Sequence, residues 1–366
     1  MNEESSKKRP VFERFMRFLN VLVIITLLAS YAGGMVSPEK FWPLAFMAMG
    51  YPIILGALTI LSLYWIRKRK WFVFLNLALL LVKADYVLGT VGIHSDSSAD
   101  QQGLKVMTYN VRLFDKYNWN SQSKSKNGII SLIGKEEPDI LCIQEYYDEK
   151  GQVLAQLDST KGLNIHLRNY YAQRNNSNDF GVATISRFPI MFEGKIVLEN
   201  SRSALAIFTD LIINEDTVRV YNIHLQSIHL GTKGYEVLDE LLQGQQVNDL
   251  SDNRLLLGRL KHGFIKRSVQ ARKIAAHIAT SPYPVIVCGD FNDVPTSYTY
   301  QTIADGLTDT FIESGKGVGA TYVRVPFFRI DNILHDGQFS SLSHHVYDTM
   351  EFSDHYAVSA KLRLKD

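Results

Sequence analysis

The stretch Val285-Ile-Val-Cys-Gly-Asp-Phe-Asn-Asp-Val-Pro295 decides the fold. Its apolar start, Val285 to Cys288, predicts a buried strand that ends at a glycine. If the segment beyond is extended, Asp290 and Asn292 project to the same side, because alternate residues of a strand share a face. A carboxylate beside a carboxamide at a strand end suits the activation of water or the binding of a cation. A simple Asp turn explains the same residues without chemistry, so the interpretation depends on the rest of the chain.

The composition divides the 366 residues into a strongly apolar N-terminal region and a region of ordinary soluble composition. Charged residues make up 21% of the chain and the formal net charge is +2, so composition alone indicates no special partner. The two cysteines, Cys142 and Cys288, each lie in a predicted buried strand. This favours free core thiols over a metal site or a disulfide.

Two uncharged stretches, Phe18–Pro38 and Phe41–Ile66, each exceed the roughly 20 apolar residues that cross a bilayer. A cleaved signal peptide fits poorly, because the first stretch is long and the second follows at once. A third stretch, Trp71–Ile93, is interrupted by Lys83 and Asp85, which would snorkel, pair or face other helices if it spans. The sequence therefore predicts an N-terminal membrane anchor with two to three transmembrane helices.

Basic residues predict the orientation of this anchor. They precede the first stretch and follow the second, at Lys7, Lys8, Arg9, Arg14, Arg17 and Arg67 to Lys70. The positive-inside rule places both clusters in the cytoplasm, so three spans put the following domain on the extracytoplasmic side of the cell (inner) membrane. With two spans it stays in the cytoplasm; we expect three. We take residues 1–93 as the anchor, 94–103 as a Ser-, Asp- and Gln-rich linker, and 104–366 as the soluble domain.

The soluble region alternates predicted strands with helices, which is typical of an α/β domain. Strands are expected over Leu104–Asn110, Pro138–Glu145, Asp179–Pro189, Ser203–Ile213, Thr217–Gln226, Arg329–Leu334 and Ser353–Leu362. Helices are expected over Gly128–Lys135 and most of Gly231–Thr280. The second helical region is basic, with no acidic residue between Asn253 and Lys273. This pattern fits a solvated face or a surface for an anionic substrate.

Polar residues at the ends of these strands suit a hard-cation site. Glu145 ends an apolar strand, where a carboxylate is costly unless it is solvated or holds something positive. Beside Asp290 it would ligate Mg²⁺ or Mn²⁺. His355 follows Asp354, and a buried carboxylate such as Asp331 would raise its basicity. Each of these residues alone also has an ordinary explanation as a solvated strand end or a loop residue.

Seven short motifs, in this order, resemble those of the endonuclease/exonuclease/phosphatase superfamily, which includes DNase I-like nucleases, neutral sphingomyelinases and inositol polyphosphate 5-phosphatases. The motifs are Thr-Tyr-Asn110, Gln-Glu145, Ser-Arg-Phe-Pro189, Asn-Ile-His224, Gly-Asp290-Phe-Asn292, Ile-Asp331 and Ser-Asp354-His355. Any one motif is weak, but together they cover nearly all of Leu104–Leu364. The resemblance implies a four-layer α/β sandwich, with two mixed sheets face to face, helices outside and the active site at one edge.

The resemblance also implies roles for individual residues. The implied ligands of a divalent metal, Mg²⁺ or Mn²⁺, are Asn110, Glu145 and Asp354. The implied catalytic residues are His224, Asp290, Asn292, Asp331 and His355, and the implied substrate contacts are Arg187 and Asn222. Within this set Asp290 and Asn292 would position or deprotonate the attacking water, and Asp331 would orient His355. His224 would contact the phosphoryl group or the leaving oxygen.

The expected activity is hydrolysis of a phosphodiester by in-line attack of an activated water. We expect first a membrane-anchored nuclease-like enzyme acting on nucleic acid. A phospholipid or inositol-phosphate headgroup hydrolase of the sphingomyelinase type is the nearest alternative, because the anchor holds the domain beside phospholipid. A non-catalytic phosphate-binding module ranks lower, since it would not need Glu145, Asp290 and His355. The sequence leaves the preferred metal and the oligomeric state open.

Overall fold

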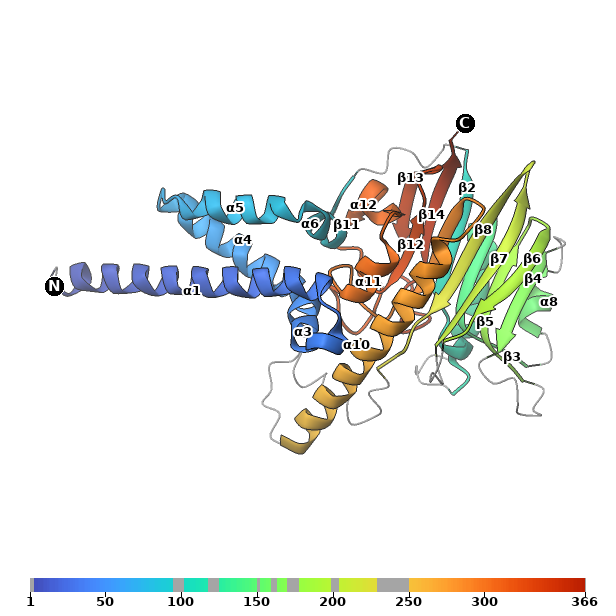
Figure 1. Ribbon diagram of the computed structural model, residues 1–366, viewed down its shortest axis with the longest axis horizontal. Helices are drawn as coiled ribbons and strands as arrows, with labels where there is room; N and C mark the ends of the chain where they lie inside the picture. Colours follow the sequence, from blue (N-terminus) through green and yellow to red (C-terminus); the bar gives the residue numbers. More distant parts are fainter. Residues whose placement is uncertain are drawn as a thin grey trace.

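Two six-stranded sheets pack face to face, with helices on their outer faces and a helical bundle projecting from one side (Figure 1). The computed structural model describes residues 3–94, 102–117, 125–149, 152–158, 163–169, 178–198, 204–228 and 250–365. The four-layer α/β sandwich expected from the sequence is confirmed. Of the expected helix over Gly231–Thr280, the residues before Leu250 lie outside this described part.

The first sheet is mixed, with a parallel pair at its centre and antiparallel strands on both sides. In spatial order its strands are β13 (Phe339–Val346), β14 (Val358–Leu364), β2 (Leu104–Asn110), β3 (Ile140–Glu149), β5 (Asn178–Ser186) and β4 (Asn164–Asn169). Two helices, α7 (Ser125–Glu136) and α8 (Gln152–Asp158), pack on its outer face. There Ile129 and Leu132 join Met107 and Leu141 in one buried cluster.

The second sheet is also mixed, and β8 and β9 form its parallel pair. In spatial order its strands are β10 (Thr308–Asp309), β12 (Asp331–His335), β9 (Val285–Asp290), β8 (Asp216–His224), β7 (Leu205–Ile213) and β6 (Ile190–Ile196). The two strands expected over Ser203–Ile213 and Thr217–Gln226 form a hairpin, with Ile213 paired to Asp216 across the turn. Helices α10 (Leu250–Ile278) and α11 (Tyr298–Ile303) cover the outer face of this sheet.

The core between the sheets consists of side chains from the inner face of each strand. Val106 and Cys142 of the first sheet meet Val220 and Cys288 of the second in one fully buried cluster. Burying each such aliphatic side chain contributes about 1.5–3 kcal/mol. Both cysteines are free and buried, as the sequence predicts.

One glycine fixes the close packing of β8 against β9. The sequence predicted that Gly289 ends the strand, but β9 continues through it to Asp290. Gly289 has a φ of 142°, and a Cβ there would lie 1.9 Å from the carbonyl oxygen of Ile223. The residue is needed for close approach of two strands, and it does not terminate one.

The N-terminal region forms a bundle of helices, which are α1 (Glu3–Met35), α2 (Pro38–Phe41), α3 (Pro43–Met49), α4 (Tyr51–Arg67), α5 (Phe72–Val82) and α6 (Ala84–Thr90). Only α1, over Val11–Met35, is by itself long and apolar enough to cross a membrane among the described residues. The expected stretches Phe41–Ile66 and Trp71–Ile93 are not continuous helices, because α3 and α4 meet at 60° and α5 and α6 at 82°. Each bent pair together still meets the same criteria of length and composition.

Both bends have local causes. Pro52 lies in the first turn of α4, where a proline starts a helix and cannot extend the preceding one. Lys83 leaves the helical conformation between α5 and α6, with φ −130° and ψ 57°. Its ammonium lies 3.8 Å from the Asp85 carboxylate, so the two charges that interrupt the third apolar stretch pair with one another.

A buried polar network holds α1, α4 and α5 together. Asn20 and Asn76 exchange hydrogen bonds of 3.1 and 3.2 Å, Trp65 Nε1 donates to Asn20 Oδ1 at 2.9 Å, and Asn76 Nδ2 donates to Ser62 Oγ at 3.0 Å. Such bonds between apolar helices contribute about 0.6–2 kcal/mol each. At the end of the bundle far from the sandwich, Lys70 Nζ lies 3.5 Å from Glu13 Oε1.

The bundle is docked on the sandwich by specific contacts. β1 (Gly92–Ile93) pairs with β11 (Lys316–Gly317), at the end of the predicted anchor and immediately before the predicted linker. Thr296 Oγ1 donates to the carbonyl of Ala48 at 2.7 Å, and Arg329 donates to the carbonyl of Gly89 at 3.1 and 3.2 Å. Of the expected linker, residues 95–101 lie outside the described part of the chain.

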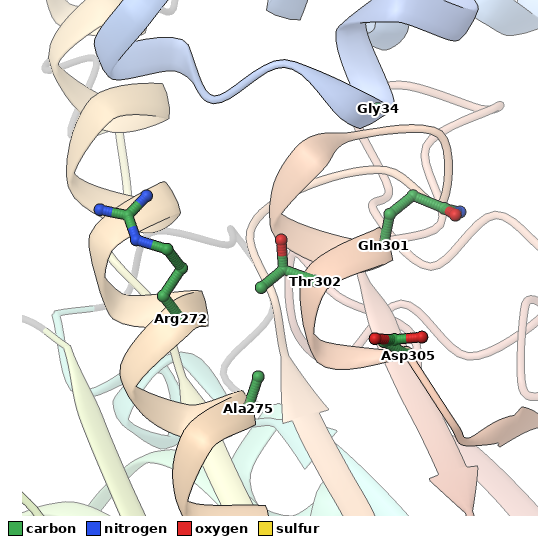
Figure 2. Close-up of a pocket in the computed structure, with 6 residues that line it drawn as sticks. All are labelled: Gly34, Arg272, Ala275, Gln301, Thr302 and Asp305. Atoms are coloured by element: carbon green, nitrogen blue, oxygen red, sulfur yellow. The ribbon is translucent and has the colours of Figure 1, made fainter. Parts of the chain in front are cut away.

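A shallow crevice of about 340 Å³ marks this junction. Figure 2 shows its lining, Gly34, Arg272, Ala275, Gln301, Thr302 and Asp305, contributed by the end of α1, by α10 and by α11 with the turn after it. Arg272 pairs with Glu39 and donates to Ser37 Oγ at 3.3 Å. The predicted site residues, all of which the structure describes, do not line this crevice.

Candidate active site

The carboxyl ends of the two parallel strand pairs bring the predicted residues to one edge of the sandwich. In the second sheet His224 lies opposite Asp290, and in the first Asn110 lies opposite Gln144, one residue before Glu145. Asn110 Nδ2 donates to Asp290 Oδ2 at 3.0 Å and so joins the two sheets at this edge. The edge is therefore built from residues that are distant in the sequence.

A bulge in β3 directs Glu145 into this edge. The pairing of β3 with β5 shifts between Ile143 and Tyr146, and Glu145 has a φ of 50°. A bulge turns a side chain toward a new direction, and a left-handed φ outside glycine costs about 1–3 kcal/mol. Glu145 Oε1 lies 3.7 Å from His224 Nε2, and 29% of its side chain stays exposed. The strained backbone thus presents a carboxylate to solvent at the mouth of the site.

Asp290 and Asn292 are adjacent, but for a different reason than the sequence suggested. The expected extended backbone is wrong, because β9 ends at Asp290 and Asn292 has a φ of 52°. In the resulting turn Asn292 donates from its backbone N to Asp290 Oδ1 at 2.7 Å and from Nδ2 to Oδ2 at 2.9 Å. Its Nδ2 also lies 3.1 Å from the carbonyl of Leu225. The turn fixes the Asp290 carboxylate in one orientation.

His355 and Asp331 form a buried pair beside Asp290. Nδ1 of His355 lies 2.9 Å from Oδ2 of Asp331, and Nε2 of His355 lies 3.9 Å from Oδ2 of Asp290. Asp331 is directly opposite Asp290 in the β12–β9 pairing. Nε2 of His224 lies 3.5 Å from the same Asp290 oxygen, so two imidazoles flank one carboxylate.

The electrostatics of the site favour a bound cation. Partial burial, followed by the charge of Asp354, raises the pKa of Glu145 to about 7. Burial also raises the pKa of Asp290, with a further contribution from Asp331. Burial lowers the pKa of His355, but the carboxylates of Asp331 and Asp290 outweigh it and leave that pKa well above its usual value. A cation beside Glu145 and Asp354 would offset the burial and the like charge that raise the pKa of Glu145.

Two donor groups have the chemistry to hold a metal ion. Asp290, Asp331 and His355 offer ligand atoms within 4.8 Å of one another. In that group Nδ1 of His355 and Oδ2 of Asp331 are already hydrogen-bonded to each other, and all three residues are buried. Glu145, Asn110 and Asp354 offer oxygen donors on the more open side, which suits a hard cation that keeps water ligands.

Arg112 belongs to the site and was missed in the sequence. It follows β2 in η1 (Arg112–Asp115), has a φ of 44°, and donates from its backbone N to Asn110 Oδ1 at 3.1 Å. Its Nε lies 3.4 Å from Asp354 Oδ2. In the sequence, Arg112 could have been identified as a basic residue two positions after Asn110, in a loop that follows a predicted strand.

Two residues proposed as substrate contacts lie elsewhere. Arg187 lies beyond the far end of β5 from Glu145, where its Nη1 is 3.6 Å from Asp139 Oδ1. Asn222 is fully buried between the sheets, where its Nδ2 donates to the carbonyl of Ala183 at 2.9 Å and its Oδ1 accepts from Gln144 at 2.8 Å. Its polar atoms therefore join the two sheets.

A family model described as "Endonuclease/Exonuclease/phosphatase family" matches residues 107–355, the whole of the edge described above. The chain belongs to the endonuclease/exonuclease/phosphatase family. This member is accordingly a phosphoester-hydrolysing enzyme, as the sequence predicted. A second model, described only as a domain of unknown function, matches residues 13–88 of the helical bundle. A comparison with curated proteins found no match.

Solved structures share the fold of this family member. It is similar to an endonuclease/exonuclease/phosphatase family protein from Leptotrichia buccalis, with 16% identity and a TM-score of 0.50 over 71% of this chain and 100% of that one. It is also similar to an endonuclease/exonuclease/phosphatase from Beutenbergia cavernae, with 19% identity and a TM-score of 0.51 over 72% of each chain. The human nocturnin catalytic domain with bound sulfate has 18% identity and a TM-score of 0.52, over 72% of this chain and 95% of that one. At these identities the likeness concerns the fold.

Proposed function

We propose that this enzyme is a divalent-metal-dependent phosphodiester hydrolase with nuclease-like activity. The observation that carries the proposal is the arrangement around Asp290, whose carboxylate lies 3.5 Å from His224 and 3.9 Å from His355. Glu145 stands at the mouth of the same edge. Hydrolysis of a charged ester requires a proton acceptor, groups that stabilise charge and protonate the leaving oxygen, and a metal ligand; Asp290, the two imidazoles and Glu145 bring these together.

The chain's own residues supply most of the proposed reaction. Asp290, held by Asn110 and Asn292, accepts a proton from the water that attacks phosphorus. Its raised pKa makes it a better base near neutral pH than an ordinary aspartate. His355, oriented by Asp331, stabilises negative charge on the phosphoryl oxygens. His224 then donates a proton to the leaving oxygen as the bond between phosphorus and that oxygen breaks.

We assign the metal to the open side of the site. Glu145, Asp354 and the Oδ1 of Asn110 would hold Mg²⁺ or Mn²⁺, both of which take oxygen ligands. A divalent ion bound there would neutralise charge on the phosphoryl oxygens as a Lewis acid. Burial and the nearby charge of Asp354, which together raise the pKa of Glu145, support this assignment, because a cation would offset both.

Membrane anchoring is part of the proposal. Residues 1–93 serve as a multi-pass anchor, 94–103 as a short linker and 104–366 as the hydrolase. The apolar length of α1 and the two bent helix pairs support up to three spans. Arg67 to Lys70 lie with the start of α1 at the end of the bundle far from the sandwich, which by the positive-inside rule favours an extracytoplasmic hydrolase at the cell membrane.

The docked bundle favours a second candidate substrate, a phospholipid headgroup. Thr296 and Arg329 hold the loops next to Asn292 and Asp331 directly against the bundle. A site held so close to the anchor works at the height of the headgroups. A nucleic acid must instead reach that site from solution.

Replacing Glu145 with Gln tests the metal assignment. We expect the concentration of Mg²⁺ needed for half-maximal hydrolysis to rise by more than the roughly 10–100-fold that loss of an outer-shell partner causes, with little change in the thermal unfolding midpoint. Glu215→Gln, in the exposed turn between β7 and β8, is the matched control and should leave the titration unchanged. An unchanged titration in Glu145→Gln would remove Glu145 from the metal site.

A further inference from the structure

The α2–α3 segment and the N-terminal half of α10 form one continuous surface beside the bundle. We call it the interfacial platform, and it consists of Lys40, Phe41, Trp42, Met47, Arg254, Leu257 and Lys261. The two parts are packed together: the rings of Phe46 and Phe264 meet edge to face at 5.1 Å, and Lys261 Nζ lies 5.3 Å from the ring centre of Trp42. The platform is therefore a defined surface of the protein.

The platform is apolar to an extent that is unusual for a surface facing water. Phe41 is 54% exposed, Leu257 47% and Met47 36%. Leu257 lies in a helix that is otherwise rich in basic residues, and Phe41 lies at the end of α2. Exposed apolar groups rimmed by charge mark a surface that contacts a partner.

The charge of the platform is positive. Arg254 and Lys261 are exposed on α10, in a stretch from Asn253 to Lys273 without any acidic residue. The nearby acidic residue of α2, Glu39, is already paired with Arg272. A partner with apolar chains below a negatively charged surface would satisfy both properties of the platform.

The position of the platform identifies that partner. The α2–α3 segment connects the end of α1 to the start of α4, so it lies at the end of the bundle that faces the sandwich. Figure 1 shows α10 extending past the sheets, with its N-terminal end reaching back to the level of α3. Where α1 crosses a bilayer, both parts of the platform lie at the surface of that same bilayer.

We propose that the interfacial platform rests in the headgroup layer of the membrane and binds anionic lipids. The inference depends on the membrane anchoring proposed above. The platform is also tied to the catalytic edge, because Arg267 of α10 lies 3.1 Å from Asp293 Oδ2 and donates to the carbonyl of Gln226 at 3.0 Å. Lipid contact on α10 thereby sets the height and tilt of the active-site edge above the membrane.

The test places a fluorescent probe on the full chain in nanodiscs. The native cysteines are buried, so Leu257→Cys can be labelled selectively. Phe18→Cys, 66% exposed on α1, reports on the anchor, and Val197→Cys, 64% exposed after β6 and outside both the bundle and the platform, is the matched negative control. Each probe is measured with headgroup- and chain-quencher lipids, in zwitterionic discs and in discs containing phosphatidylglycerol.

We expect the Phe18 probe to be quenched by chain quenchers in both discs and the Val197 probe in neither. The Leu257 probe should be quenched by headgroup quenchers, more strongly with phosphatidylglycerol. The double change Arg254→Glu and Lys261→Glu should remove that extra quenching, since each cation near an anionic surface changes binding roughly fivefold.

Two results would overturn the inference. One is a Leu257 probe as unquenched as the Val197 probe while the Phe18 probe is quenched. The other is a Leu257 probe that responds to a single-stranded oligonucleotide and to neither lipid, which would make the platform a nucleic-acid surface. An unquenched Phe18 probe would instead refute the anchor itself.

Discussion

The hydrogen bonds around Asp290 predict how Asp290→Asn separates stability from activity. Its carboxylate accepts three bonds, one at Oδ1 from Asn292 N (2.7 Å) and two at Oδ2 from Asn292 Nδ2 (2.9 Å) and Asn110 Nδ2 (3.0 Å). An asparagine offers one acceptor oxygen, so at least one buried donor loses its partner. We expect the free energy of unfolding to fall by about 1–3 kcal/mol.

The same change should lower activity much more. Asp290→Asn removes the proposed proton acceptor, and the loss of a general base lowers the rate about 10²–10⁴-fold. This corresponds to about 3–5 kcal/mol of activation free energy, above the expected loss of stability. The assay is p-nitrophenol release from bis(p-nitrophenyl) phosphate by the full chain, alongside thermal unfolding of the same preparation.

Asp216→Asn provides the control, since this exposed residue lies at the opposite end of β8 and should alter neither quantity. Activity within tenfold of wild type in a folded Asp290→Asn enzyme would refute the role of Asp290 as base. An unfolding midpoint that drops below the assay temperature would be resolved by repeating the assay in the cold.

Three further predictions concern stability. Gly289→Ala should lower the free energy of unfolding by about 3 kcal/mol or more, because its Cβ would overlap a carbonyl of β8. Gly134→Ala, in open space on α7, should instead raise the free energy of unfolding by about 1 kcal/mol, and thermal unfolding distinguishes the two. Burial lowers the pKa of His344 to about 3, so between about pH 6.5 and pH 3 this side chain is protonated in the unfolded chain and neutral in the folded one. As the pH falls through this range, the free energy of unfolding should decrease by about 1.4 kcal/mol per pH unit. Unfolding midpoints at several pH values should show this slope in wild type and a smaller one in His344→Gln. Arg329→Gln removes the cation that lies 2.7 Å from the buried Asp309 carboxylate, and the free energy of unfolding should fall by about 3–5 kcal/mol. Amide hydrogen exchange should then rise in α6, whose Gly89 carbonyl accepts from Arg329; unchanged exchange would contradict the docking contact.

Local patterns were sufficient to predict much of the sandwich. β2 begins and ends at the predicted Leu104 and Asn110, and the β7–β8 hairpin turns in the gap between the two strands predicted over Ser203–Ile213 and Thr217–Gln226. These elements follow from alternation and turn chemistry, which act over a few residues. The apolar run of α1 is likewise a property of the chain itself.

Other features depend on contacts between distant segments, and the sequence does not show them. The bulge at Glu145 arises from a shift in pairing with β5, and the contact of Arg112 with Asp354 joins residues at opposite ends of the domain. The turn at Asn292 replaces the extended geometry that alternation suggests. The pairing of Gly92 with Gly317 could not be predicted, because the composition at the end of an apolar stretch does not show which distant strand it meets.

The most direct measurement of the central claim is metal-dependent turnover by the purified full chain in nanodiscs. Wild type and His355→Ala are given supercoiled plasmid, sphingomyelin and a phosphoinositide in parallel, with and without EDTA. The account predicts nicking of the plasmid that EDTA abolishes, Mg²⁺ or Mn²⁺ restores, and His355→Ala lacks. Headgroup release with intact plasmid would select the lipid alternative at the same site. Turnover that survives EDTA or the loss of His355, or no turnover of any phosphodiester, would contradict the account.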